Sequence, residues 1–237
     1  MVARQKRELQ QKLIRSWTNG HLVEALLKTD LFEEAYGQDQ ILFDLFPKAR
    51  LTIGMDICRD TVRRAALLCP IAAGRFVTAD VRQLPLRSDT IDLVVSNSTL
   101  DHFNCREDLL VALRELFCIL KPGGLLFITM DNPRNPLYHP LRWVSKWLRK
   151  PFSLGYTTSQ ATLVRCLECA GFIVVSQAGL IHNPRLISTF LFFMLRRLLG
   201  RHAEGPIRAL LRVFARLERL PTAEFTACFV AACARKP

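Results

Sequence analysis

Two aspartates and a pair of small polar residues follow short apolar runs in the first half of this sequence. The aspartates are Asp56 and Asp80, and the polar pair is Ser96 and Asn97. Apolar runs this short are typical of parallel strands covered on both faces, and ligands bind where the carboxyl ends of such strands meet. Carboxylates there accept hydrogen bonds from ribose hydroxyls and from an adenine amine. The pattern therefore predicts a nucleotide-binding site.

The apolar runs alternate with helical stretches, which predicts an α/β fold. The expected strands cover residues 26–29, 51–55, 75–78, 91–95, 125–129, 173–178 and 225–232. The expected helices cover residues 38–46, 60–68, 107–120, a segment opened by the capping-box pair Thr157 and Gln160 and closed by Gly171, and one or two more in residues 5–27. At 237 residues, the chain suits one domain, residues 1–237. We expect a doubly wound, mostly parallel sheet of seven strands.

Four sequence blocks resemble the class I S-adenosylmethionine (SAM) dependent methyltransferases, and in particular the type 11-like group. In chain order they are Gly54-Met55-Asp56-Ile57, Ala79-Asp80-Val81, the segment 84–97 and Leu120-Lys121-Pro122-Gly123-Gly124. The resemblance implies a Rossmann-like fold with an antiparallel C-terminal hairpin strand. It also implies SAM as the cofactor and a small molecule as the methyl acceptor.

The same resemblance implies a role for each residue that follows a strand. Asp56 would bind the ribose hydroxyls, and Ile57 would pack against the adenine. Asp80, with the backbone of Val81 beside it, would accept from the adenine amine. The pair that follows the fourth strand, Ser96 and Asn97, would face the methionine part of the cofactor and the acceptor.

The sequence departs from this family after the first strand. Family members have an acid and a glycine-rich loop there, whereas residues 28–37 contain the single glycine Gly37. Asp30 can take the acid position, and Gly37 can permit a left-handed turn. Two outcomes remain open at this loop: Asp30 with Glu33 or Glu34 holds the cofactor's amino group by charge, or the pocket has decayed. The altered loop also supports an alternative function, a SAM-binding partner module without catalysis.

One histidine is a candidate catalytic residue. Methyl transfer needs little acid–base help, because the enzyme aligns the reacting atoms and removes water. His102 follows the fourth strand, beside Asp101, and is a candidate base for a hydroxyl acceptor. The alternative is that His102 only caps or packs its loop. His139 and His182 are second candidates for the base, although structural roles fit both of them better. We expect no metal site, because the pair Cys166 and Cys169 has no second pair and no histidine nearby.

The acceptor is inferred from the segments around the site. An N-terminal helical lid (1–27) is expected to pack over the sheet edge, and two caps (131–156, with Trp143 and Trp147, and 183–222) are expected on the substrate side. The second cap combines the apolar run 190–195 with arginines spaced along one helix face, namely Arg208, Arg212, Arg216 and Arg219. This combination favours an apolar or amphiphilic small molecule, which can be lipid-like, and peripheral contact with a membrane surface. A core-packing helix beside a solvated one is the alternative.

Charge and composition bear on the remaining classes. The formal net charge of +12 permits nucleic acid, so an RNA methyltransferase stays an alternative. Nucleic acid is disfavoured because Ser96-Asn97-Ser98-Thr99 is not the Asn/Asp-Pro-Pro-aromatic motif of enzymes that methylate base amines. A nicotinamide-dependent oxidoreductase is disfavoured by the missing Gly-x-Gly-x-x-Gly turn. Cysteines within apolar runs and a polar, basic N-terminus predict a cytoplasmic protein, and the oligomeric state stays open.

Overall fold

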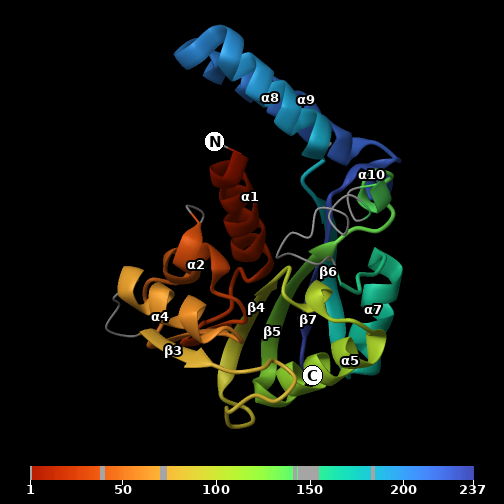
Figure 1. Ribbon diagram of the computed structural model, residues 1–237. Coiled ribbons are helices and arrows are strands. Elements are labelled where there is room, and N and C mark those ends of the chain that lie inside the picture. Colours follow the sequence, from red (N-terminus) through yellow and green to blue (C-terminus); the bar gives the residue numbers. More distant parts are fainter. Residues whose placement is uncertain (1, 38–40, 70–73, 141–142, 144–154, 183–184) are drawn as a thin grey trace.

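A single seven-stranded sheet organises the chain. The computed structural model describes residues 2–37, 41–69, 74–140, 143, 155–182 and 185–237, and the strand order is β3-β2-β1-β4-β5-β7-β6 (Figure 1). The strands are β1 (Ala25–Lys28), β2 (Leu51–Asp56), β3 (Gly74–Thr78), β4 (Ile91–Asn97), β5 (Leu120–Asp131), β6 (Ile173–Leu180) and β7 (Phe229–Arg235). All neighbouring pairs are parallel except the two that β7 makes. The expected fold class, including the antiparallel C-terminal strand, is confirmed.

Helices cover both faces of the sheet. One face carries α1 (Val2–Trp17), α2 (Phe32–Tyr36), α3 (Leu42–Leu45) and α4 (Arg59–Leu68); the other carries α5 (Arg106–Ile119) and α7 (Gln160–Cys169). Successive side chains of β4 alternate between the two faces. Leu93 and Val95 pack in the apolar cluster on the face that carries α1 to α4, and Val94 packs in the cluster on the face that carries α5 and α7. Both faces of β4 are therefore buried, as its continuous apolar run predicts.

The N-terminal helix lies on a face of the sheet, whereas the sequence predicted that it would pack over the sheet edge. Ile14 of α1 is fully buried against central strands, and the ring of Trp17 lies 5.6 Å from that of Phe127 in β5. The helix takes this position because its apolar side chains recur at helical spacing and form one stripe. Segment 1–27 thus contributes to the core, and its role as a lid stays a prediction.

Several predicted element bounds are wrong. Residues 32–36 form α2 and residues 42–45 form α3, where one helix over 38–46 was expected, and residues 38–40 lie outside the described part of the chain. The last strand begins at Phe229 instead of residue 225, because Ala223–Thr226 form α10. The cap of α7 is Ser159, whose Oγ accepts from the Thr162 N–H, while the Thr157 hydroxyl bonds the Asp131 carbonyl.

Gly123 and Gly124 lie in β5, which begins at Leu120, directly after α5. Gly123 has a φ of +79°, so the turn of the backbone after α5 is made inside the strand.

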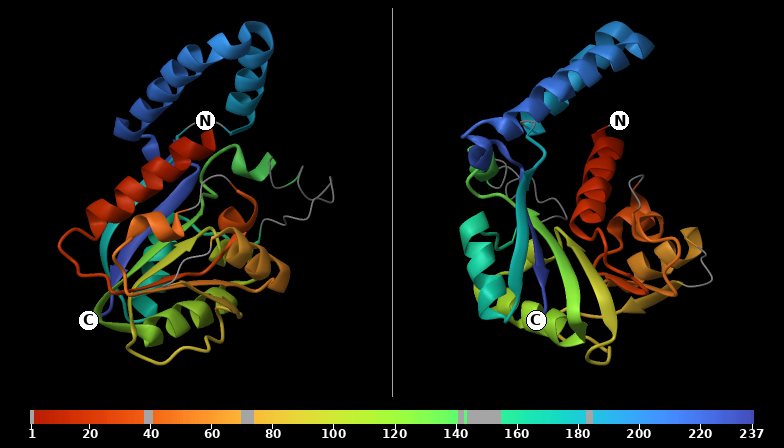
Figure 2. Two further views of the ribbon diagram at one scale, coloured as in Figure 1. Left: turned by 90° about the vertical axis from the view of Figure 1, so that its left-hand side faces the viewer. Right: turned by 180° about the vertical axis from the view of Figure 1, so that it is seen from behind.

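The two helices expected within residues 183–222 are confirmed as α8 (Arg185–Leu199) and α9 (Glu204–Ala215), with 3₁₀ turns at Gly200–Ala203 and Arg216–Arg219. Figures 1 and 2 show these helices projecting away from the sheet and its two helical layers. Half of the first cap, including Trp147, lies outside the described residues, whereas Trp143 is described and exposed.

We expect Ile14→Ala to lower the free energy of unfolding by about 2–5 kcal/mol, because it removes buried methyl groups and leaves a cavity between α1 and the sheet. Urea unfolding followed by circular dichroism measures this change. The half-exposed Leu9 of the same helix provides the control, and Leu9→Ala should cost less than about 1 kcal/mol. Equal losses for the two variants would show that α1 is not docked on the sheet.

Candidate cofactor site

A cavity of about 560 Å³ lies at the carboxyl ends of β1, β2 and β4. This volume is in the usual range for small-molecule sites. Seven of the nine residues that the sequence singled out line it: Asp30, Asp56, Ile57, Asp80, Val81, Asn97 and His102. Gly37 and Ser96 are not among the lining residues. The sheet edge therefore brings the predicted residues together, as parallel strands must.

Asp56 is held in place by backbone groups from two segments. Its Oδ1 accepts from the Cys58 N–H at 2.8 Å, and its Oδ2 accepts from the Leu31 N–H at 3.1 Å. Each carboxylate oxygen can accept a second hydrogen bond, so the residue can still bind a ligand diol. Ile57, next in sequence, is largely exposed at the cavity and offers an apolar surface.

Asp80 is paired with an arginine that the sequence analysis did not single out. Arg82 Nη2 lies 2.6 Å from Asp80 Oδ2, and Arg82 Nη1 lies 3.0 Å from Asp108 Oδ1. The same guanidinium lies 5.4 Å from the centre of the Phe103 ring. Hydrogen bonding from Arg82 lowers the pKa of Asp80 below its ordinary value. A ligand amine at Asp80 must therefore share this carboxylate with Arg82.

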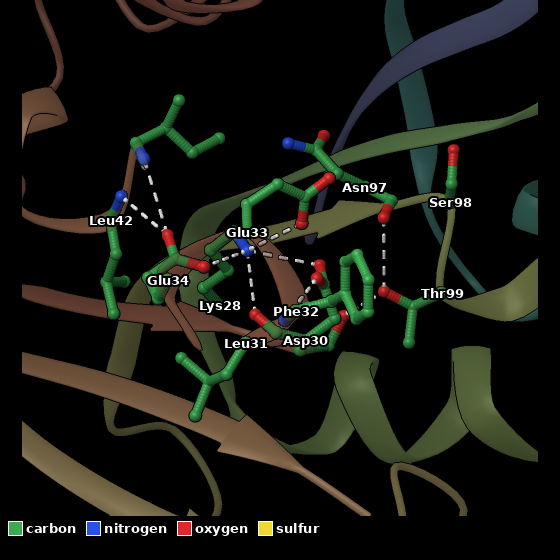
Figure 3. A network of polar contacts seen from close by, with 12 residues as sticks. Lys28, Asp30, Leu31, Phe32, Glu33, Glu34, Leu42, Asn97, Ser98 and Thr99 are labelled. Carbon is green, nitrogen blue, oxygen red and sulfur yellow. Dashed lines mark hydrogen bonds and ion pairs between the residues drawn. The ribbon is translucent and has the colours of Figure 1, made fainter. Parts of the chain in front are cut away.

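A buried ammonium joins β1 to the segment that follows it. Lys28 is 1% exposed, and its Nζ lies 2.7 Å from Glu34 Oε2 and 3.2 Å from Asp30 Oδ2 (Figure 3). Glu33 Oε2 lies 3.8 Å away. Glu34 Oε1 in turn accepts from the N–H groups of residues 41 and 42. One lysine thus connects β1 with α2 and, through Glu34, with α3.

The charges in this cluster are unequal. Burial raises the pKa of Asp30 well above its ordinary value, although the charge of Lys28 opposes this. Burial also acts to raise the pKa of Glu33, but the charges of Lys28 and Lys6 outweigh it and lower that pKa to about 2. The Asp30 carboxyl therefore holds its proton more tightly than Glu33 does, and the two side chains hydrogen-bond each other.

The segment 28–37, which stands in place of the glycine-rich loop, packs closely against the sheet without glycines of its own at the contact. Leu31 is fully buried and packs directly over β2, where a Cβ on Gly54 would lie 2.6 Å from Leu31 Cδ2. The glycine that permits this close contact therefore lies in β2 and not in the segment that follows β1. The predicted left-handed turn at Gly37 is wrong, because Gly37 has a φ of −89° and ends α2 in an extended conformation.

The end of β4 presents an amide whose acceptor has no partner. Asn97 is buried at the cavity, and its Oδ1 makes no hydrogen bond with any part of the chain that the structure describes. Ser96, in contrast, is fully buried, and its Oγ lies 3.0 Å from the Thr29 hydroxyl. Ser96 therefore does not face the cavity, and Thr29 and Thr99 take that place. A buried acceptor left unpaired is costly, so Asn97 points to a ligand donor.

His102 is exposed and lines the cavity from the 3₁₀ turn Leu100–His102. Its neighbour Asp101 is buried, and Asp101 Oδ2 accepts from the Asp131 N–H at 2.9 Å. Burial, followed by the charge of Asp131, raises the pKa of Asp101 to about 6. Of the other histidines, His182 is buried with its Nδ1 2.8 Å from the Thr226 hydroxyl, and exposed His139 contacts the Tyr138 ring. Both positions fit structural roles.

One group of carboxylates has a spacing that suits a metal ion. Single oxygens of Asp30, Glu33 and Glu34 lie within 4.8 Å of one another. The Lys28 ammonium pairs with all three and supplies the positive charge there. Cys166 and Cys169 lie on α7, the first buried and the second exposed, and both are free thiols.

This chain matches a known family model over part of its length, and it resembles solved structures in fold. Residues 34–128 match the family model of a methyltransferase domain. Residues 34–128 thus carry a methyltransferase domain, and the strand order is that of the fold expected for class I SAM-dependent methyltransferases. No curated protein sequence matches it.

Solved structures resemble this chain over nearly its whole length. A SAM-dependent methyltransferase from Archaeoglobus fulgidus superimposes with a TM-score of 0.61 at 19% identity, covering 97% of this chain and 94% of the other. The N-methyltransferase NodS from Bradyrhizobium japonicum, in complex with S-adenosyl-L-homocysteine (SAH), gives 0.59 at 15%, covering 98% and 87%. The [4+2]-cyclase SpnF gives 0.63 at 18%, covering 97% and 80%. At these identities the likeness shows the fold alone.

We expect Lys28→Met to lower the free energy of unfolding by about 3–5 kcal/mol, because it leaves the fully buried Glu34 without its cation. Lys121→Met is the control, since Lys121 and Asp92 form a partly exposed pair worth at most about 1 kcal/mol. The double variant Lys28→Met, Glu34→Gln should recover part of the loss. Chemical denaturation of the three variants measures these free energies of unfolding. Equal stability of the two lysine variants would contradict the structural role of the Lys28–Glu34 pair.

The stability of the protein should also depend on pH through Asp101. Because its pKa is raised to about 6 on folding, the stabilisation is fully present below the ordinary carboxyl pKa of about 4 and is lost as the pH rises through 6. In the wild type, we expect the free energy of unfolding to fall by an amount on the order of 2 kcal/mol between about pH 4 and 7 through this group, and Asp101→Asn should remove this dependence. Asp89→Asn, at an exposed turn, should keep the wild-type slope in the same denaturation series. An unchanged slope in Asp101→Asn would refute the assignment.

Proposed function

We propose that this methyltransferase binds SAM in the cavity and transfers its methyl group to a small apolar or amphiphilic acceptor. The observation that carries the proposal is the charge of the cavity. Five carboxylic acids and one guanidinium line it: Asp30, Glu33, Asp56, Asp80 and Asp108, with Arg82. The chain as a whole has a formal net charge of +12, so this concentration of acids is local. An acidic cavity attracts a cationic sulfonium cofactor and repels a dinucleotide pyrophosphate or an RNA backbone.

The lining residues fit the parts of SAM. Asp56 would accept from the ribose hydroxyls, with Ile57 against the adenine. Asp80, sharing its charge with Arg82, would accept from the adenine amine beside Val81. The unpaired Asn97 Oδ1 supports a donor at its position, and the ammonium of the methionine part supplies one. Since α2 replaces the glycine-rich loop, Asp30 and Glu33 would hold this ammonium with side chains in place of backbone amides.

Bound SAM would supply an electrophilic methyl group on a positively charged sulfur. The residues of the chain would then need to orient the acceptor and exclude water. His102 lies at the cavity and would take the proton of a hydroxyl acceptor. Phe32, Met55 and Phe103 give the same cavity apolar walls, which supports an apolar or amphiphilic acceptor.

A SAM-binding module without catalysis is the second candidate. The replacement of the glycine-rich loop by α2 favours it, because a helix carrying Phe32 and Glu33 narrows the approach to the cofactor's methionine part. Fold likeness does not decide between the two, since one structural neighbour is a [4+2]-cyclase. Transfer of a labelled methyl group from SAM to apolar and amphiphilic candidate acceptors separates them, and binding without transfer to any acceptor would favour the module.

Calorimetric titration tests the cofactor proposal. We expect the wild type to bind SAM and not NAD, and Asp56→Asn to weaken SAM about 10- to 100-fold, because a hydrogen bond to a charged group is lost. Asp89→Asn, at the exposed turn, removes the same charge away from the cavity and should leave the affinity unchanged. Wild-type affinity in Asp56→Asn, or tighter binding of NAD than of SAM, would overturn the cofactor assignment.

A further inference from the structure

The helices α8 and α9, with the 3₁₀ turns that follow each of them, form a projection that we call the arm (residues 185–219). Both views of Figure 2 show the arm standing clear of the two helical layers. It leaves the body after β6, which runs parallel to β5 because both strands are antiparallel to β7. The arm therefore starts at the carboxyl end of the sheet, the same end that carries the cavity.

The arm has a small core of its own. Phe192 of α8 is buried with Ala203, Ile207 and Leu211. The helical spacing of Ile207 and Leu211, four residues apart, places both on the face of α9 that meets α8. The arm thus has a packed interior, and most of its other side chains that the structure describes are exposed.

The outer surface of α8 is apolar to an unusual degree. Its exposed large side chains include Phe190 (66%), Phe193 (58%), Leu198 (77%) and Leu199 (42%). Phe190, Phe193 and Arg197 are three and then four residues apart, so they share one stripe of the helix. Exposed apolar side chains clustered in this way mark an interaction surface.

The arm is also strongly basic. It contains eight arginines and two glutamates, so residues 185–219 carry half of the formal net charge of +12. Arg208, Arg212 and Arg216 are exposed and recur every four residues, which places them on one side of α9. Arg196 and Arg197 are exposed at the end of α8. Apolar side chains and arginines therefore lie within the same projection.

We propose that the arm binds the surface of an anionic lipid bilayer. The exposed phenylalanines and leucines of α8 enter the headgroup region, and the arginines contact lipid phosphates. No helix among the described residues is long and apolar enough to cross a membrane, so the contact is peripheral. A second copy of the chain is a poor occupant, since two arms of like charge repel each other. A nucleic acid would satisfy the arginines but leave the apolar side chains in water.

Docking would place the bilayer at the end of the sheet where the cavity opens. If the proposed function holds, an amphiphilic acceptor can then reach the cavity from the membrane surface. Binding of the arm itself does not depend on SAM or on methyl transfer, so the vesicle experiment can succeed where the cofactor proposal fails.

Co-sedimentation with vesicles tests the proposal. We expect the wild type to bind phosphatidylglycerol–phosphatidylcholine vesicles at low salt and not vesicles of phosphatidylcholine alone. The triple variant Arg208→Gln, Arg212→Gln, Arg216→Gln should bind about 100-fold more weakly, from about fivefold for each arginine near the surface. The variant Phe190→Ser, Phe193→Ser should also bind more weakly, and more so at high salt, where apolar insertion must hold the protein.

Matched controls come from exposed residues of the body. Arg63→Gln, Arg87→Gln, Arg114→Gln removes the same charge, and Leu67→Ser, Leu68→Ser removes exposed apolar side chains from α4. Both controls should bind as the wild type does, and circular dichroism checks that every variant is folded. The proposal is overturned if the wild type does not bind anionic vesicles, if body and arm variants lose binding equally, or if the arm variants instead dissociate a dimer or abolish RNA binding.

Discussion

The ion cluster around Lys28 is the interaction on which the rest of the site depends. A fully buried ammonium is tolerated only when anionic groups surround it, and the three acids that follow β1 provide them. Glu34 then accepts from the backbone at residues 41 and 42, so the same cluster fixes the start of α3. In this chain, side-chain charge therefore shapes the segment that the family resemblance assigns to glycines.

This arrangement decides both the shape and the charge of the cavity. Because α2 begins at Phe32, the side chains of Phe32 and Glu33 line the cavity directly. The close packing of the segment comes from β2, where Gly54 leaves space for Leu31. The result is a cavity with more carboxylates than cations inside a protein that is basic overall, while the arm carries half of the net positive charge. The two charged regions thus suit ligands of opposite sign.

The sequence predicted the strand-end residues well and the connections poorly. Asp56, Asp80 and Asn97 meet at one edge because each lies at or just after the carboxyl end of a parallel strand, and such strands are visible in the sequence as short apolar runs. The helix α2 was missed because it is five residues long and is held by a buried ion cluster, which no local periodicity reveals. Arg82 was missed because its partner Asp108 comes from α5, far along the chain. The start of β7 was misplaced because the apolar residues of α10 continue the run of the strand.

The acidic cavity is the central claim, and the salt dependence of binding tests it most directly. SAM carries one more positive charge than SAH, whereas the two molecules are otherwise nearly the same. Calorimetric titration of both at increasing ionic strength should show that the affinity for SAM falls more steeply than that for SAH, because salt screens the attraction between the cavity and the sulfonium. In Glu33→Gln, the salt dependences of the SAM and SAH affinities should become more alike, because the cavity has lost one negative charge. Parallel dependences for SAM and SAH in the wild type would contradict the account.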